Sequence, residues 1–99
     1  MLMTVKQFGD NLASRDNGAT LRKMILAEIK SDEHSCITID FKDVNSVSSS
    51  FADEAFGKIA EEIGFNNFKQ RTTFSNVNKI NSTVILNAIV ARSSLQRKT

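Results

Sequence analysis

Three consecutive serines, Ser48–Ser50, are the residues whose type and spacing point most clearly to chemistry. They follow a polar loop that begins at Asp40, and they precede the acidic pair Asp53 and Glu54. A serine before a helix usually accepts a hydrogen bond from a main-chain N–H, whereas an exposed serine can be phosphorylated or can act as a nucleophile. The segment from Asp40 to Glu54 is therefore the predicted functional site, with serines that either cap the helix or take part in recognition.

A helix must follow the serines, because apolar residues recur there at helical spacing, at Ala52, Ala55, Phe56, Ile59 and Ile63. The pattern predicts Ser50 as the N-cap, with Asp53 reaching back toward the cap as in a capping box. Gly64 is the expected residue beyond the C-terminus, where a positive φ ends the helix.

The remaining pattern predicts strands and helices in alternation. Ile37 to Phe41 is β-branched and apolar, which is typical of a buried central strand. The expected flanking elements are an edge strand within Leu2–Gln7, a turn-rich connection from Gly9 to Gly18, a helix from Ala19, and a strand within Lys69–Phe74. Val77 to Leu95 fits a helix, although Thr83 to Leu86 alone also fits a buried strand.

This order predicts one α/β domain over residues 1–99, with a small, mostly parallel or mixed sheet and helices packed on it. Ligands and partners of such sheets usually bind at the carboxyl ends of the strands, where Asp40 to Ser50 lies. The predicted core comprises Ile25, Ile29, Ile37, Ile39, Phe41, Ala52, Phe56, Ile59 and Ile63.

Four other polar residues allow both a structural and a functional interpretation. Asp40 and Asp43 could form an acid–base pair or a cation site, but isolated loop carboxylates more often form solvated turns, and no metal or cofactor is predicted. His34, the only imidazole, could serve a Ser–His–Asp relay only beside a serine, but it precedes the central strand, at the end away from the serines, so a surface histidine is expected. Arg15 could either pair with Asp53 and Glu54 or bind an external phosphate.

Composition narrows the range of partners. The chain has 99 residues and a net charge of only +2, and its basic residues are dispersed, apart from small groups at Lys69, Arg71, Arg92, Arg97 and Lys98. Nucleic-acid binders usually carry a denser basic stripe, so the composition does not favour a nucleic-acid partner.

The lone Cys36 lies in an apolar run, where a buried, inert thiol is expected. No segment is apolar enough to cross a membrane. We therefore expect a cytoplasmic protein.

The loop resembles the corresponding strand, loop and helix of anti-sigma-factor antagonists. Matching the two puts Ser49 at the position that a partner kinase phosphorylates, with Ser48 in place of the usual Asp and Phe51 in place of a Gly. The chain is more similar to the STAS-like family of unknown function, over about Val5 to Ala91. The residues that carry this similarity are Gly9, Leu12, Ser14-Arg15, Leu21, Ile39-Asp40-Phe41, Val44, Ser49-Ser50-Phe51-Ala52-Asp53-Glu54 and Phe56.

The resemblance implies a non-catalytic regulatory module that presents the serine loop and the following helix to a protein partner, such as an ATP-binding anti-sigma-type kinase. Two alternatives stay open at this point. One is a weak nucleic-acid-binding accessory protein that uses the basic groups, and the other is a small serine hydrolase.

Overall fold

Three short parallel strands form the main sheet of the computed structural model, which describes residues 1–97. The order is β1 (Leu2–Thr4), β3 (Ile37–Asp40) and β5 (Thr72–Ser75), so that Ile39 lies opposite Met3 on one side and Phe74 on the other. A second parallel pair joins β2 (Asn11–Leu12) to β4 (Ser46–Val47). The predicted α/β class and the central position of the Ile37 strand are confirmed.

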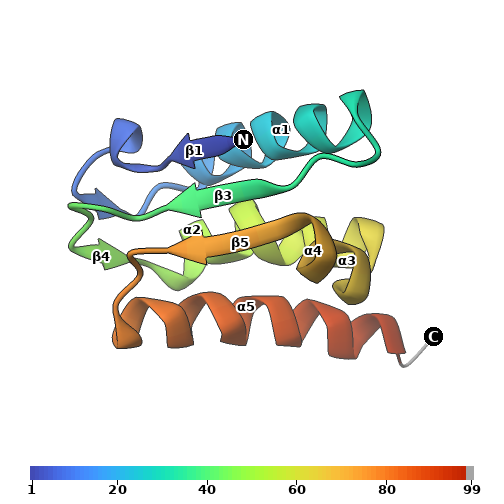
Figure 1. Cartoon of the computed structure of the whole chain (residues 1–99). Helices are drawn as coiled ribbons and strands as arrows, with labels where there is room; N and C mark the ends of the chain where they lie inside the picture. The colour runs from blue at the N-terminus through green and yellow to red at the C-terminus, as the bar shows by residue number, and fades with distance from the viewer. Residues whose placement is uncertain (98–99) are drawn as a thin grey trace.

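The helices lie mainly on one side of this sheet (Figure 1). The helical elements are η1 (Lys6–Phe8, a 3-10 turn), α1 (Arg15–Ser31), α2 (Ser49–Ala52), η2 (Asp53–Gly57), α3 (Lys58–Ile63), α4 (Phe65–Arg71) and α5 (Lys79–Arg97). In the view of Figure 1, β1, β3 and β5 run in front of α1, α2 and α3, while α5 runs alongside β5.

The helix after the serines, here called the second helix, runs without a break from Ser49 to Ile63 and comprises α2, η2 and α3. Its middle segment, η2, is π-helical. Its buried residues are spaced by four, at 51, 55 and 59 and at 52, 56 and 60. A straight α-helix would rotate such a stripe by about 40° at every step of four residues. The wider π turn offsets part of this rotation and keeps the apolar face directed at the sheet.

Phe56 lies at the centre of the core that this face forms. Its ring centroid is 5.2 Å from that of Phe74 and 6.1 Å from that of Phe41. Seven of the nine predicted core residues are buried, while Ile29 and Ile63 are half-buried at its edge. The pattern missed Phe51, which is fully buried against Phe56.

The first helix begins at Arg15, four residues earlier than predicted, because Ser14 caps it. The Ser14 hydroxyl accepts a hydrogen bond from the main-chain N–H of Asn17 at 3.2 Å. Gly18, predicted to end a turn, lies inside α1, where a Cβ would be 2.9 Å from both Glu54 Cβ and Phe51 O. The glycine is therefore needed for close approach to the second helix.

One further boundary differs from the prediction, and two other expectations are confirmed. Lys69 to Arg71 belongs to α4, and the strand begins only at Thr72, because Phe68 buries its ring and the N–H of Phe68 bonds to Gly64 O. Thr83 to Leu86 is helical within α5, as the length of the pattern indicated. Gly64 has the expected positive φ of 89°.

Cys36 is exposed, which corrects the expectation of a buried thiol. It precedes β3 by one residue, and its Sγ donates to Gln70 O at 3.6 Å. The alternation of the run places Ile37 and Ile39 inward, so that Cys36 falls on the outward side.

We expect Phe56→Ala to lower the free energy of unfolding by about 3–5 kcal/mol, because the change leaves a cavity among three packed rings. Phe65→Ala is the matched control, since that ring is only partly buried. Urea denaturation measures both variants. Equal losses in the two variants would contradict the central position of Phe56.

Candidate partner-binding site

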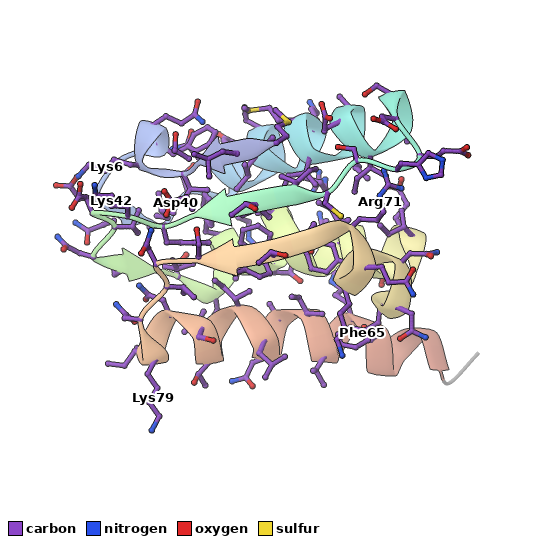
Figure 2. The ribbon with its side chains drawn as sticks, in the orientation of Figure 1. Lys6, Asp40, Lys42, Phe65, Arg71 and Lys79 are labelled. Atoms are coloured by element: carbon purple, nitrogen blue, oxygen red, sulfur yellow. The ribbon has the colours of Figure 1, made fainter. Side chains whose placement is uncertain are left out.

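Asp40 ends the central strand and holds it to the segment after β5. Its Oδ1 accepts hydrogen bonds from Asn76 Nδ2 at 2.7 Å, from Ser75 Oγ at 3.2 Å and from Lys42 N at 3.1 Å. The bond from Asn76 contributes most to lowering the pKa of Asp40. Figure 2 shows Asp40 near Lys6 and Lys42 at the carboxyl ends of the strands. These bonds give Asp40 a structural role.

The other predicted cation-site residue, Asp43, is an exposed turn residue with a positive φ of 65°. Its carbonyl accepts from Lys6 Nζ at 3.2 Å. Across the residues that the structure describes, no three His, Cys, Asp or Glu side chains are grouped as metal ligands.

Ser48 is the N-cap of the second helix, which corrects the prediction of Ser50. Its backbone is extended, with φ −80° and ψ 159°, and its Oγ accepts from Phe51 N at 3.0 Å. The same hydroxyl donates to Ala13 O at 3.2 Å. The helix thus begins at Ser49, and Ser50 lies inside its first turn, where its hydroxyl cannot take the capping position.

Ser49 and Ser50 open onto a shallow pocket between the start of the second helix and α5. Its volume is 350 Å³, and Arg15 and Asp53 also line it, together with Val84, Asn87 and Ala88 of α5. Ser49 is exposed, and Ser50 is half-buried. The pocket brings together four of the seven predicted site residues.

Asp53 binds arginines and does not reach back toward the cap, so the predicted capping box is wrong. Its two carboxylate oxygens accept from Arg92 Nε at 2.8 Å and Nη2 at 2.9 Å, a bidentate pair. Arg15 Nη1 lies 3.4 Å from the same carboxylate. The bidentate pair directs the Asp53 side chain toward Arg92 and thereby links the second helix to α5.

Glu54 is the centre of three ion pairs. It accepts from Lys58 Nζ at 2.8 Å, from Arg22 Nη1 at 2.9 Å and from Arg15 Nη1 at 3.0 Å. Only 12% of its side chain is exposed, so the cations compensate a largely desolvated carboxylate. The predicted pairing of Arg15 with Asp53 and Glu54 is present.

These contacts lower the pKa values of both carboxyl groups. The bond from Arg92 is the main cause for Asp53. Lys58, followed by Arg22, lowers the pKa of Glu54 from 4.5 to about 2, against the opposing effect of burial. Both groups are ionised at neutral pH, so neither can serve there as a general acid.

Sequence reasoning missed Arg22 and Lys58 as parts of this cluster and assigned Arg92 to a basic surface. Lys58 was available as a signal, because it stands four residues after Glu54 on one helix. The arginines come from α1 and α5, and their pairing depends on tertiary packing.

Two of the basic residues considered for nucleic-acid binding are engaged inside the protein. Arg71 donates to the carbonyls of Ser35 at 2.7 Å and Ile29 at 3.1 Å, and to that of Asp32, at the end of α1. Arg92 binds Asp53. Lys98 and the side chain of Arg97 lie outside the described residues.

His34 is exposed in the turn between α1 and β3, beside Glu33. The serines follow the opposite, carboxyl end of β3. In Figure 2, Arg71, which bonds to Ser35 O next to His34, and Asp40 lie at opposite ends of the sheet. A Ser–His relay is therefore not assembled by this fold.

The arrangement defines a small α/β domain with an exposed serine at the start of its second helix and with the ion pairs of Asp53 and Glu54 one turn later. The family model for a STAS-like domain of unknown function matches residues 17–81, and the chain belongs to this family. The match includes the strand, the loop, the serines and the carboxylate pair, and it begins after Arg15. No curated protein and no solved structure matches the chain significantly.

Within the described part of the chain, no helix combines the length and the apolar character that a membrane span requires.

We expect Ser48→Ala to cost about 0.5–2 kcal/mol of unfolding free energy, because it removes the cap. Ser49→Ala and Ser50→Ala are the matched controls and should change stability by less than about 0.5 kcal/mol. Chemical denaturation of the three variants measures this. A larger loss for Ser50→Ala than for Ser48→Ala would place the cap at Ser50 after all.

The charge on Glu54 should make stability depend on pH. Because its folded-state pKa is lowered from 4.5 to about 2, its contribution is complete above pH 4.5 and disappears as the pH falls to about 2. We expect Glu54→Gln to be less stable than the parent at neutral pH, with a difference that shrinks over this acidic range. Urea melts at several pH values measure it.

Glu62→Gln is the control, since the Glu62 side chain is 53% exposed and only 3.9 Å from Lys30. It should differ little from the parent at any pH. A Glu54→Gln difference that stays constant down to pH 2 would show that the ion pairs contribute nothing through charge.

Proposed function

We propose that this protein is a regulatory interaction module that acts by binding a protein partner and not by catalysis. Ser49 carries the proposal. It is exposed at the first position of the second helix, while the neighbouring Ser48 performs the capping. Ser49 can therefore be modified or contacted without loss of a bond that the helix needs.

The proposed partner is an ATP-binding kinase of the anti-sigma type, which the similarity to anti-sigma-factor antagonists supports. The Ser49 hydroxyl would accept the γ-phosphoryl group, with ADP as the leaving group. Such a kinase uses cytoplasmic ATP, so we place the protein in the cytoplasm. The recognised surface comprises the pocket residues Arg15, Ser49, Ser50 and Asp53, with Ser48 and Asp40 supporting the loop and Glu54 supporting Arg15.

Phosphorylation would add about −1.5 to −2 charges at this surface. Asp53 and Glu54 would repel it, but Arg92, Arg22 and Lys58 already compensate these carboxylates. Arg15, whose side chain is 55% exposed, lines the same pocket and supplies a cation. The fold should therefore persist while the charge of the surface changes sign, which is the behaviour of a switch.

The test is phosphate incorporation into the purified protein from labelled ATP in an extract of the cell that produces it. We expect one phosphate, located at Ser49 by mass spectrometry of peptides. Ser49→Ala should abolish the label, and Ser50→Ala, as the matched control, should keep it.

Label that persists in Ser49→Ala would move the switch to another residue. An unmodified Ser49, both in the extract and in protein isolated from the same cells, would reduce the serines to structural residues and overturn the proposal.

A further inference from the structure

Among the residues that the structure describes, no strand covers the apolar side of α5 beside β5. Two adjoining hollows, of 140 and 500 Å³, share Phe74, Leu86 and Ile89. Together they form a groove whose other principal lining residues are Phe65, Phe68 and Lys69. Leu86 is 53% exposed, which is high for a leucine beside three phenylalanines. Figure 2 shows Phe65 beside α5.

The groove runs along an open sheet edge. Within residues 1–97, β5 lies at the edge of the three-stranded sheet and pairs with β3 alone. Ser75 O accepts from Phe41 N, so the main-chain groups of Ser75 face β3. Because these groups alternate along a strand, the N–H and C=O of Phe74 face the open edge. A further strand placed there would lie over the apolar side of α5.

The charged side chains of the elements that line the groove have one sign. The chain contains no Asp or Glu after Glu62, so α4, β5 and α5 carry only basic charged side chains. Lys69 lies in the wall of the groove, and it is exposed. Lys79 stands at the start of α5 (Figure 2). An occupant with acidic side chains is therefore favoured.

Other occupants fit less well. A second copy related by a two-fold axis would bring α4, β5 and α5, which carry no acidic residue, against the same elements, and Lys69 and Lys79 of the two copies would repel each other. A nucleic acid requires a row of available cations, whereas the floor here is apolar and Arg71 bonds to carbonyls of its own chain. An extended acidic peptide with apolar residues at alternate positions satisfies the edge, the floor and the charge together.

We infer that the groove binds an extended, acidic segment of a protein partner, which adds to β5 as a fourth strand. Its main chain pairs with Phe74, its apolar side chains cover Leu86 and Ile89, and its carboxylates lie near Lys69. This surface is distinct from the Ser49 pocket. Val84 and Ala88 line that pocket, whereas Leu86 is about 200° from Val84 around α5.

The test is selection of random 12-residue peptides displayed on phage against the full chain. We expect enriched peptides in which acidic and apolar residues alternate. A synthetic copy should shift the amide resonances of Phe74 and Leu86 in the ¹⁵N spectrum and leave that of Ser49 unchanged. Leu86→Glu should weaken its binding by at least about tenfold, and Lys69→Glu by a smaller factor.

Ile80→Glu is the matched control, because Ile80 is also an exposed apolar residue of α5, 77% exposed, but lies outside the lining of the groove. It should keep binding within about twofold. Circular dichroism checks that each variant is folded, and Lys69→Glu provides the answer if Leu86→Glu is not.

Three results would overturn the inference: no enriched peptide, enriched peptides without acidic residues, or binding that neither Leu86→Glu nor Lys69→Glu weakens. Dimerisation of the parent in sedimentation, abolished by Leu86→Glu, would assign the groove to a second copy and also reject the acidic partner. None of these results affects the phosphorylation test at Ser49, since that test concerns the opposite side of α5.

Discussion

The structure depends on the pairing of two carboxylates on the second helix with cations from both neighbouring helices. Asp53 and Glu54 lie where that helix meets α1 and α5, and burial of an unpaired carboxylate there would be costly. Two glycines allow the close approach that the pairing requires. A Cβ on Gly57 would be 3.1 Å from Ala88 O, and one on Gly18 would be 2.9 Å from Glu54 Cβ.

Within the serine loop, Ser48 has a structural role, whereas Ser49 is accessible to a partner. Ser48 bonds to Phe51 N and Ala13 O, and thereby joins the helix to the segment before α1. Ser49, one residue later, begins the helix and is exposed at the pocket. The ion pairs fix the floor of that pocket, so a partner meets a preformed surface. The groove beside β5 lies on another side of α5, and two partners could bind without direct competition.

The α/β order, the central strand and most of the core could be predicted, because burial of one face spaces apolar residues regularly along the sequence. Ile37 and Ile39 are two residues apart in a strand, and Phe56 recurs at helical spacing with its neighbours. The predicted cap, Ser50, was two residues too late, because local sequence rules do not distinguish three adjacent serines. Only the hydrogen bond from Phe51 N identifies Ser48 as the cap. The roles of Arg22 and Arg92 depend on contacts over 30 or more positions. The exposed groove escaped prediction because Leu86 directly follows the buried Ile85, and only the tertiary structure shows that Leu86 is 53% exposed.

The ¹⁵N spectrum of protein that carries phosphoserine at position 49, compared with that of the unmodified protein, tests the surface switch most directly. We expect shifts confined to the pocket, at Arg15, Ser50 and Asn87, while the core amide resonances of Ile39 and Phe56 stay in place. The unfolding free energy should change by no more than about 1 kcal/mol, because the site lies on a solvated surface beside a cation. Loss of dispersion across the spectrum, or displacement of the core resonances, would contradict a surface switch on a rigid domain.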